Sequence, residues 1–256
     1  MEHKAIRDLF GWVPSRGKPN YRKVTAGHTE YLQILVSFDG FPTYACIPLR
    51  GRPDMSNPHG HETFLDFLRA RVEAYTRSKG TDEGFQLSEA DLAEIRDEIL
   101  DFYRRRRFLL EAATPAREFE VVVRDGDHAL KLMEMLDRYS PDSDQAWTHR
   151  KYEPYIKCHM IQARLLQLLD AGDYRAAVTA AREGIAAIAE FDRGHEAWEY
   201  SEMDESIHPR SLIGHLEEMV VKLLGEAQQQ AVEKESYESA ALIRDLLTGF
   251  DPNDRL

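Results

Sequence analysis

The sequence has few cysteines and no long apolar run, and both absences restrict the class of protein. Only two cysteines, Cys46 and Cys158, occur in 256 residues, too few for a disulfide framework and without the paired spacing of a zinc site. Reduced thiols in a cytoplasm are the simplest expectation. No window approaches the roughly 18 uninterrupted apolar residues of a membrane helix. Residues 1–17 lack the apolar core of a signal peptide, so we expect a cytoplasmic protein with no membrane segment.

The chain also lacks a surplus of basic side chains. Its 45 acidic residues outnumber 33 basic ones, which gives a formal net charge of −12. Binding to nucleic acid depends on neutralising phosphates, so general nucleic-acid binders usually carry a basic surplus. Nucleic acid is therefore not expected to be the main partner. The balance is reversed only locally, in residues 1–25, which we predict to form a basic N-terminal arm.

Motifs for common kinds of catalysis are missing as well. The sequence contains no G-x-S-x-G, no glycine-rich phosphate loop and no H-E-x-x-H. His159 follows Cys158, but adjacent residues on a helix point about 100° apart, which makes a poor catalytic dyad. No cofactor is expected. An enzyme with a site in the N-terminal domain stays open as an alternative, because folding can bring distant residues together.

One short stretch, residues 58–62, contains side chains of the types that bind metal ions. These are His59, His61 and Glu62. A metal site would need a further ligand from another part of the chain, and the sequence marks none. We expect an exposed loop that enters a helix here, and a metal site remains the alternative.

The apolar patterning predicts an α+β fold that is predominantly helical. Within residues 31–49, two β-rich runs flank Asp39-Gly40, which is typical of a β-hairpin with a tight turn. Two prolines in the second run place that strand at a sheet edge, where no ladder donor is needed. A third strand is predicted at residues 119–123, FEVVV.

Helical periodicity covers most of the remaining chain. Ser88 and Asp91 resemble a capping box at the start of one strongly periodic segment. Apolar residues at three- and four-residue steps predict helices over residues 61–78, 88–112, 153–169, 174–190, 211–234 and 237–248. Asp125-Gly126-Asp127 is expected to end the strand at 119–123, and a further helix should follow it through about Tyr139.

The predicted elements divide the chain into two domains after the basic arm. Residues 26–140 should form an α+β domain with a small antiparallel sheet. Residues 145–250 should form an all-α domain of helical hairpins. The polar stretch SPDSD, residues 140–144, is the predicted linker.

Four successive arginines, Arg104, Arg105, Arg106 and Arg107, lie within the predicted helix 88–112. They spread over about 300° around a helix, so they cannot form one flat patch. We expect their stems to cover apolar surface while their charged groups pair with acidic side chains. Phosphate binding by two of them stays open, and with it a DNA-repair accessory that uses a local basic patch.

A first helical hairpin is predicted at residues 155–190, where Gly172-Asp173-Tyr174 precedes Ala177 and the small residue Gly184. In this second half the hairpin resembles a tetratricopeptide repeat. Small side chains let two antiparallel helices approach closely, and the tyrosine ring is expected to cover the open end of the hairpin. The tryptophan and glycine usual in the first helix of that repeat are absent, so a generic αα-hairpin is the alternative.

A second hairpin near the carboxyl end has a more specific pattern. An aromatic-Glu pair is followed by Ala-Ala and then by Arg-Asp. Here these are Tyr237-Glu238, Ala240-Ala241 and Arg244-Asp245. Residues 216–250 thereby resemble the UvrB/UvrC motif, a helical hairpin, with Tyr237 in place of the usual phenylalanine.

The resemblance implies docking onto another protein without chemistry. Two helices have too little interior to bury all their apolar positions, so the open face of Tyr237, Ala241, Leu242 and Leu246 should cover its own chain or a partner. Arg244 could grip a partner carboxylate, or pair with Glu238 or Glu217. The leading hypothesis is a non-enzymatic adaptor whose partner is another protein. The predicted docking residues are Tyr237, Glu238, Ala241, Leu242, Arg244 and Asp245.

Overall fold

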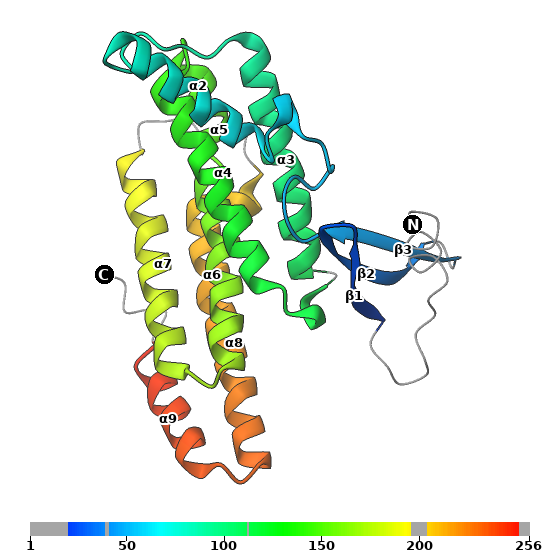
Figure 1. Cartoon of the computed structure of the whole chain (residues 1–256). Helices are drawn as coiled ribbons and strands as arrows, with labels where there is room; N and C mark the ends of the chain where they lie inside the picture. Colours follow the sequence, from blue (N-terminus) through cyan, green and yellow to red (C-terminus); the bar gives the residue numbers. More distant parts are fainter. Residues whose placement is uncertain (1–19, 39–40, 112, 196–203, 251–256) are drawn as a thin grey trace. The chain divides into compact units, whose positions relative to one another are not determined.

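The computed structural model describes residues 20–38, 41–111, 113–195 and 204–250. As predicted, the chain is predominantly helical and carries a small antiparallel sheet (Figure 1). It divides into two compact units, residues 1–146 and 147–256. Within the described part of the chain, no helix is both long and apolar enough to cross a membrane.

The sheet of the first unit has the strand order β1-β2-β3. Its strands are β1 (Tyr21–Ala26), β2 (Thr29–Phe38) and β3 (Phe41–Pro48), and both pairings are antiparallel. The predicted hairpin of β2 and β3 is confirmed, and β3 lies at an edge, where its prolines remove no ladder donor. The predicted turn residues Asp39-Gly40 lie outside the described part.

Strand β1 corrects the prediction of a basic arm over residues 1–25. Residues 21–25 belong to this strand, while residues 1–19 lie outside the described part. Its basic side chains find partners within the fold. Lys23 Nζ lies 2.8 Å from a carboxylate oxygen of Glu118, and Arg22 Nε donates to Gln33 Oε1 at 2.7 Å. An edge strand tolerates charged side chains because one side of it faces solvent.

Three long helices complete the first unit: α2 (Phe64–Lys79), α3 (Glu89–Glu111) and α4 (Phe119–Tyr139). The capping box at the start of α3 is confirmed. Asp91 N–H donates to Ser88 Oγ at 3.2 Å, and Ser88 N–H donates back to Asp91 Oδ2 at 2.8 Å. These bonds satisfy backbone donors that the first turn of a helix leaves without partners.

The predicted strand at residues 119–123 is wrong, because this stretch is the first turn of α4. Valine disfavours a helix by only about 0.7 kcal/mol or less per residue. Helical spacing continues from Phe119 and Val122 through the rest of α4, where Ala129, Leu132 and Leu136 are also buried. Burial of that continuous stripe outweighs the local preference of three valines.

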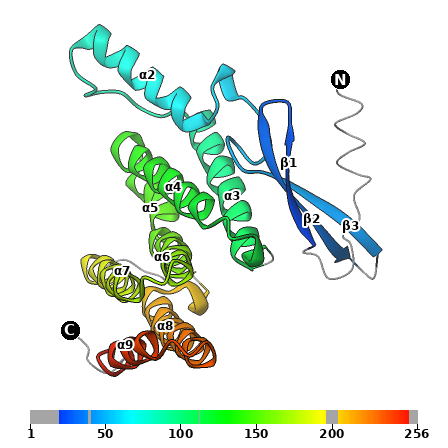
Figure 2. The same ribbon diagram turned by 60° about the horizontal axis from the view of Figure 1, so that its bottom comes forward.

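The second unit is all helical. Helix α5 (Ser143–Arg150) spans the division between the units and includes part of the predicted linker. The helices that follow are α6 (Glu153–Asp170), α7 (Tyr174–Gly194), α8 (Pro209–Glu233) and α9 (Tyr237–Thr248). They form two antiparallel hairpins, α6–α7 and α8–α9, with α8 also packed along α6 and α7 (Figure 2).

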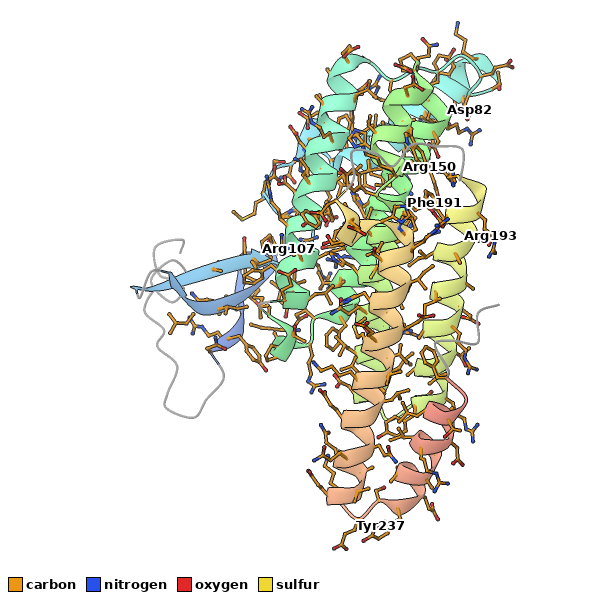
Figure 3. All side chains as sticks on the ribbon, turned by 180° about the vertical axis from the view of Figure 1, so that it is seen from behind. Asp82, Arg107, Arg150, Phe191, Arg193 and Tyr237 are labelled. Atoms are coloured by element: carbon orange, nitrogen blue, oxygen red, sulfur yellow. The ribbon has the colours of Figure 1, made fainter. Side chains whose placement is uncertain are left out.

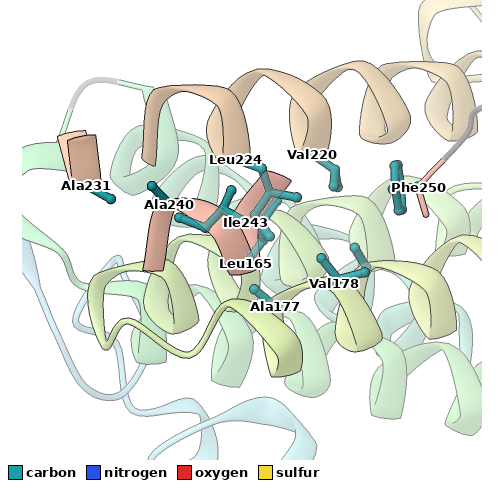
Figure 4. Close-up of a cluster of buried hydrophobic side chains, with 10 residues drawn as sticks. Leu165, Ala177, Val178, Val220, Leu224, Ala231, Ala240, Ile243 and Phe250 are labelled. Atoms are coloured by element: carbon teal, nitrogen blue, oxygen red, sulfur yellow. The ribbon is translucent and has the colours of Figure 1, made fainter. Parts of the chain in front are cut away.

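One apolar cluster joins all four of these helices (Figure 4). Tyr174 packs against it, as expected for the tyrosine that closes the first hairpin. Gly184 of α7 faces Ile161 of α6 so closely that an added Cβ would collide with its side chain. The buried members of the cluster are Leu165, Ala177, Val178, Ala181, Val220, Leu224, Ala231, Ala240, Ile243 and Phe250.

Candidate functional site

The inner face of α9 is part of the core of the second unit. Ala240 and Ile243 are buried, and Leu246 and Leu247 pack against the same cluster. Helices α6, α7 and α8 contribute the other members of that cluster. The chain's own helices therefore cover Leu246, and the hairpin is not a thin two-helix unit that leaves this side open.

The outer face of α9 carries the residues that the sequence predicts for docking. Tyr237, Ala241 and Arg244 recur at four- and three-residue steps, and all three are exposed. Glu238 and Asp245 are also exposed and flank this row, while Leu242 is half-buried at its margin. We call the set Tyr237, Glu238, Ala241, Arg244 and Asp245 the outer face of α9.

Tyr237 stands at the end of the α8–α9 hairpin (Figure 3). It is 66% exposed, the highest exposure among the large apolar residues of the described chain. Tyr237 therefore differs from Tyr174, which packs against the core of the second unit. Val232, in the last turn of α8, is 50% exposed, so two large side chains flank the turn between the helices.

Backbone hydrogen bonds define the turn between α8 and α9. Ser236 N–H donates to Ala231 O at 2.8 Å, and Glu235 N–H donates to Val232 O at 3.0 Å. Glu235 has a φ of 58°, in the left-handed region usual after a helix end. The hairpin therefore presents Val232 and Tyr237 from a defined backbone.

Arg244 makes neither of the internal contacts expected from the sequence, with Glu238 or Glu217. Its Nε and Nη2 both donate to Asp245 Oδ1, at 3.0 and 2.8 Å. Both side chains are about two-thirds exposed, at 65% and 66%. A surface pair of this kind contributes only about 0–1 kcal/mol, so a partner could displace it at little cost.

The arginine run of α3 does not form a four-residue phosphate site. Arg105 and Arg106 are buried, at 2% and 1% exposed, and both bond to Asp125. Arg104 and Arg107 are exposed, but they pair with acids of their own helix. Arg105 and Arg106 are therefore excluded as phosphate-binding residues in the nucleic-acid hypothesis, because neither reaches the surface.

The histidine-rich stretch packs against an aromatic ring. His59 stacks on Phe67 with ring centroids 4.0 Å apart, and His61 lies tilted against the same ring at 5.7 Å. Glu62 is exposed. Among the described residues, no group of three or more His, Cys, Asp or Glu side chains is arranged to hold a metal ion.

A pocket of about 530 Å³ opens in the first unit, between α3 and the loop before α2. One of its walls is Arg52, whose guanidinium bonds to Asp54 and lies 3.3 Å from Glu98. Burial alone would lower the pKa of Arg52, but the hydrogen bonds and charge of Asp54, with Glu98 and Glu94, raise it. The lining residues are Arg52, Asp54, Ser56, Asn57, Pro58, Glu94, Asp97, Leu100, Asp101 and Arg104.

Ion pairs hold both arginines that line this pocket. Asp101 pairs with Arg104 at 3.0 Å, and Glu94 lies 3.5 Å from Arg52. Burial raises the pKa of Asp54, but the Ser56 N–H, the Ser56 hydroxyl and Arg52 together lower it below its ordinary value. The pocket is therefore the open side of an ion-pair network that joins the loop to α3.

Sequence reasoning missed Glu98, a fully buried carboxylate in this network. It accepts from the N–H groups of Phe64 and Leu65, at 2.7 and 3.2 Å, and contacts His128 Nε2 at 2.7 Å. A carboxylate at the first turn of a helix compensates its open N–H groups and its dipole. The signal in the sequence was a lone acid on the apolar stripe of α3, beside Ile95 and Phe102.

Cys158 is buried, and burial raises the pKa of its thiol to about 12. The thiolate is the nucleophilic form, so this side chain is held in its unreactive state at neutral pH. His159 instead packs at 4.4 Å from the ring of Tyr155. Both observations agree with the expectation that the Cys158–His159 pair is a poor catalytic dyad.

Comparison of the chain with known protein families, with curated proteins and with solved structures found no match. The functional assignment therefore depends on the residues and contacts described above. Of these, the outer face of α9 combines exposed apolar surface with a rigid support.

Proposed function

We propose that the chain is a cytoplasmic, non-enzymatic adaptor that binds another protein through the outer face of α9. The observation that carries the proposal is the 66% exposure of Tyr237 on a helix whose opposite side is buried in the core. Tyrosine is enriched among the residues that dominate binding energy at protein interfaces.

The support beneath this face favours binding because it is already ordered. Ile243 is fully buried directly across α9, and the guanidinium of Arg182 in α7 donates to Gly249 O just after the helix ends. A surface fixed in its bound conformation loses little conformational entropy when a partner arrives. Little of the favourable interaction energy with a partner is therefore offset by ordering of the outer face.

The composition of the face is suited to a helix or loop of a second protein. Ala241 leaves space beside Tyr237 for a partner side chain, because an alanine projects only a methyl group. Arg244 can exchange Asp245 for a partner carboxylate in a two-hydrogen-bond contact. These are also the residues on which the resemblance to the UvrB/UvrC motif depends.

The test is a quantitative pull-down from native cytoplasm with the full chain and two outer-face variants. Ala241→Trp fills the space beside Tyr237, and Arg244→Glu reverses the exposed charge. Arg164→Glu is a matched control, because Arg164 is an exposed arginine of α6 that bonds only to a neutral side chain, Gln167. Proteins retained by the wild type and the control, and lost with both outer-face variants, would support docking. Identical sets of retained proteins for all four would remove it.

A further inference from the structure

We draw no further inference here: the strongest candidate, the acid-rich pocket of about 530 Å³ between α3 and the loop before α2, holds both of its arginines in the ion pairs already described, and nothing within the described residues points to a ligand for its remaining carboxylates.

Discussion

Arg105 of α3 and Asp125 of α4 form a buried ion pair with two parallel hydrogen bonds. Nε donates to Oδ2 at 2.5 Å and Nη2 donates to Oδ1 at 2.7 Å, while Nη1 donates to Pro48 O at 2.9 Å. Arg105 is 2% exposed and Asp125 is fully buried. The pair joins two helices to the end of β3, and it removes Arg105 from the surface where a phosphate would bind.

Loss of one partner of this pair should be strongly destabilising. Asp125→Ala leaves the Arg105 guanidinium buried without its counter-charge, which we expect to cost about 3–5 kcal/mol of unfolding free energy. Urea denaturation at neutral pH measures this loss of unfolding free energy. Arg107→Ala is the control, because Arg107 pairs with Glu111 on the surface, where ion pairs contribute little to stability, so its loss should be much smaller. Similar losses for the two variants would show that the buried pair has no special role.

The two kinds of helix glycine should respond oppositely to alanine. Gly184→Ala forces a methyl group into the Ile161 side chain and should destabilise by about 1–3 kcal/mol. Gly225→Ala meets open space and should stabilise by up to about 1 kcal/mol, because glycine is the poorer helix former. Thermal unfolding of both variants shows whether each substitution raises or lowers stability. Ile161→Val should recover part of the loss in Gly184→Ala, and an equal effect of alanine at both positions would refute the close approach of α6 and α7.

The capping box of α3 should contribute measurably to the free energy of unfolding. Ser88→Ala removes the acceptor for Asp91 N–H, and loss of such a cap typically costs about 0.5–2 kcal/mol. Ser88→Gly should cost less, since glycine also occurs at this position. Chemical denaturation of the two variants checks the order, and a Ser88→Ala protein as stable as the wild type would exclude the cap.

Asp91 should make folding sensitive to acid. Burial raises the pKa of its carboxyl, but the Ser88 N–H, Arg71 and the Ser88 hydroxyl together hold the pKa below its ordinary value. The unfolded chain therefore takes up this proton first. The stabilisation is complete above the unfolded pKa of about 4 and is lost as pH falls through the lower folded pKa. In denaturation curves between neutral and acid pH, Asp91→Asn should lose less stability than the wild type. Identical pH dependence for the two would contradict this role.

Local signals predicted most of the helices, and they failed where a distant contact decided the structure. Periodicity and capping residues identified α3, and the bounds of α9 agree with the prediction of 237–248. Asp125-Gly126 is typical of a turn, yet both residues are buried inside α4. Asp125 is helical there because Arg105 supplies its partner from another helix. No local pattern contains that information.

The candidate site shows the same division between local and distant information. The sequence grouped Tyr237, Ala241, Leu242 and Leu246 on one open face, but only Tyr237 and Ala241 are exposed, and Leu246 packs against the core. Spacing could not show that α6 and α7 cover the opposite face at Ile243, because that contact joins distant segments. Strand β1 was missed because its pairing with β2, and not its composition, makes it a strand.

The most direct test of the account places a photocrosslinking amino acid at Tyr237 of the full chain in its native cells. Thr179, exposed on α7, receives the same group as a control. We predict a discrete crosslinked protein at position 237, absent at position 179 and strongly reduced when Arg244→Glu is added. No crosslinked protein at 237, or the same set of proteins at both positions, would contradict docking through the outer face of α9.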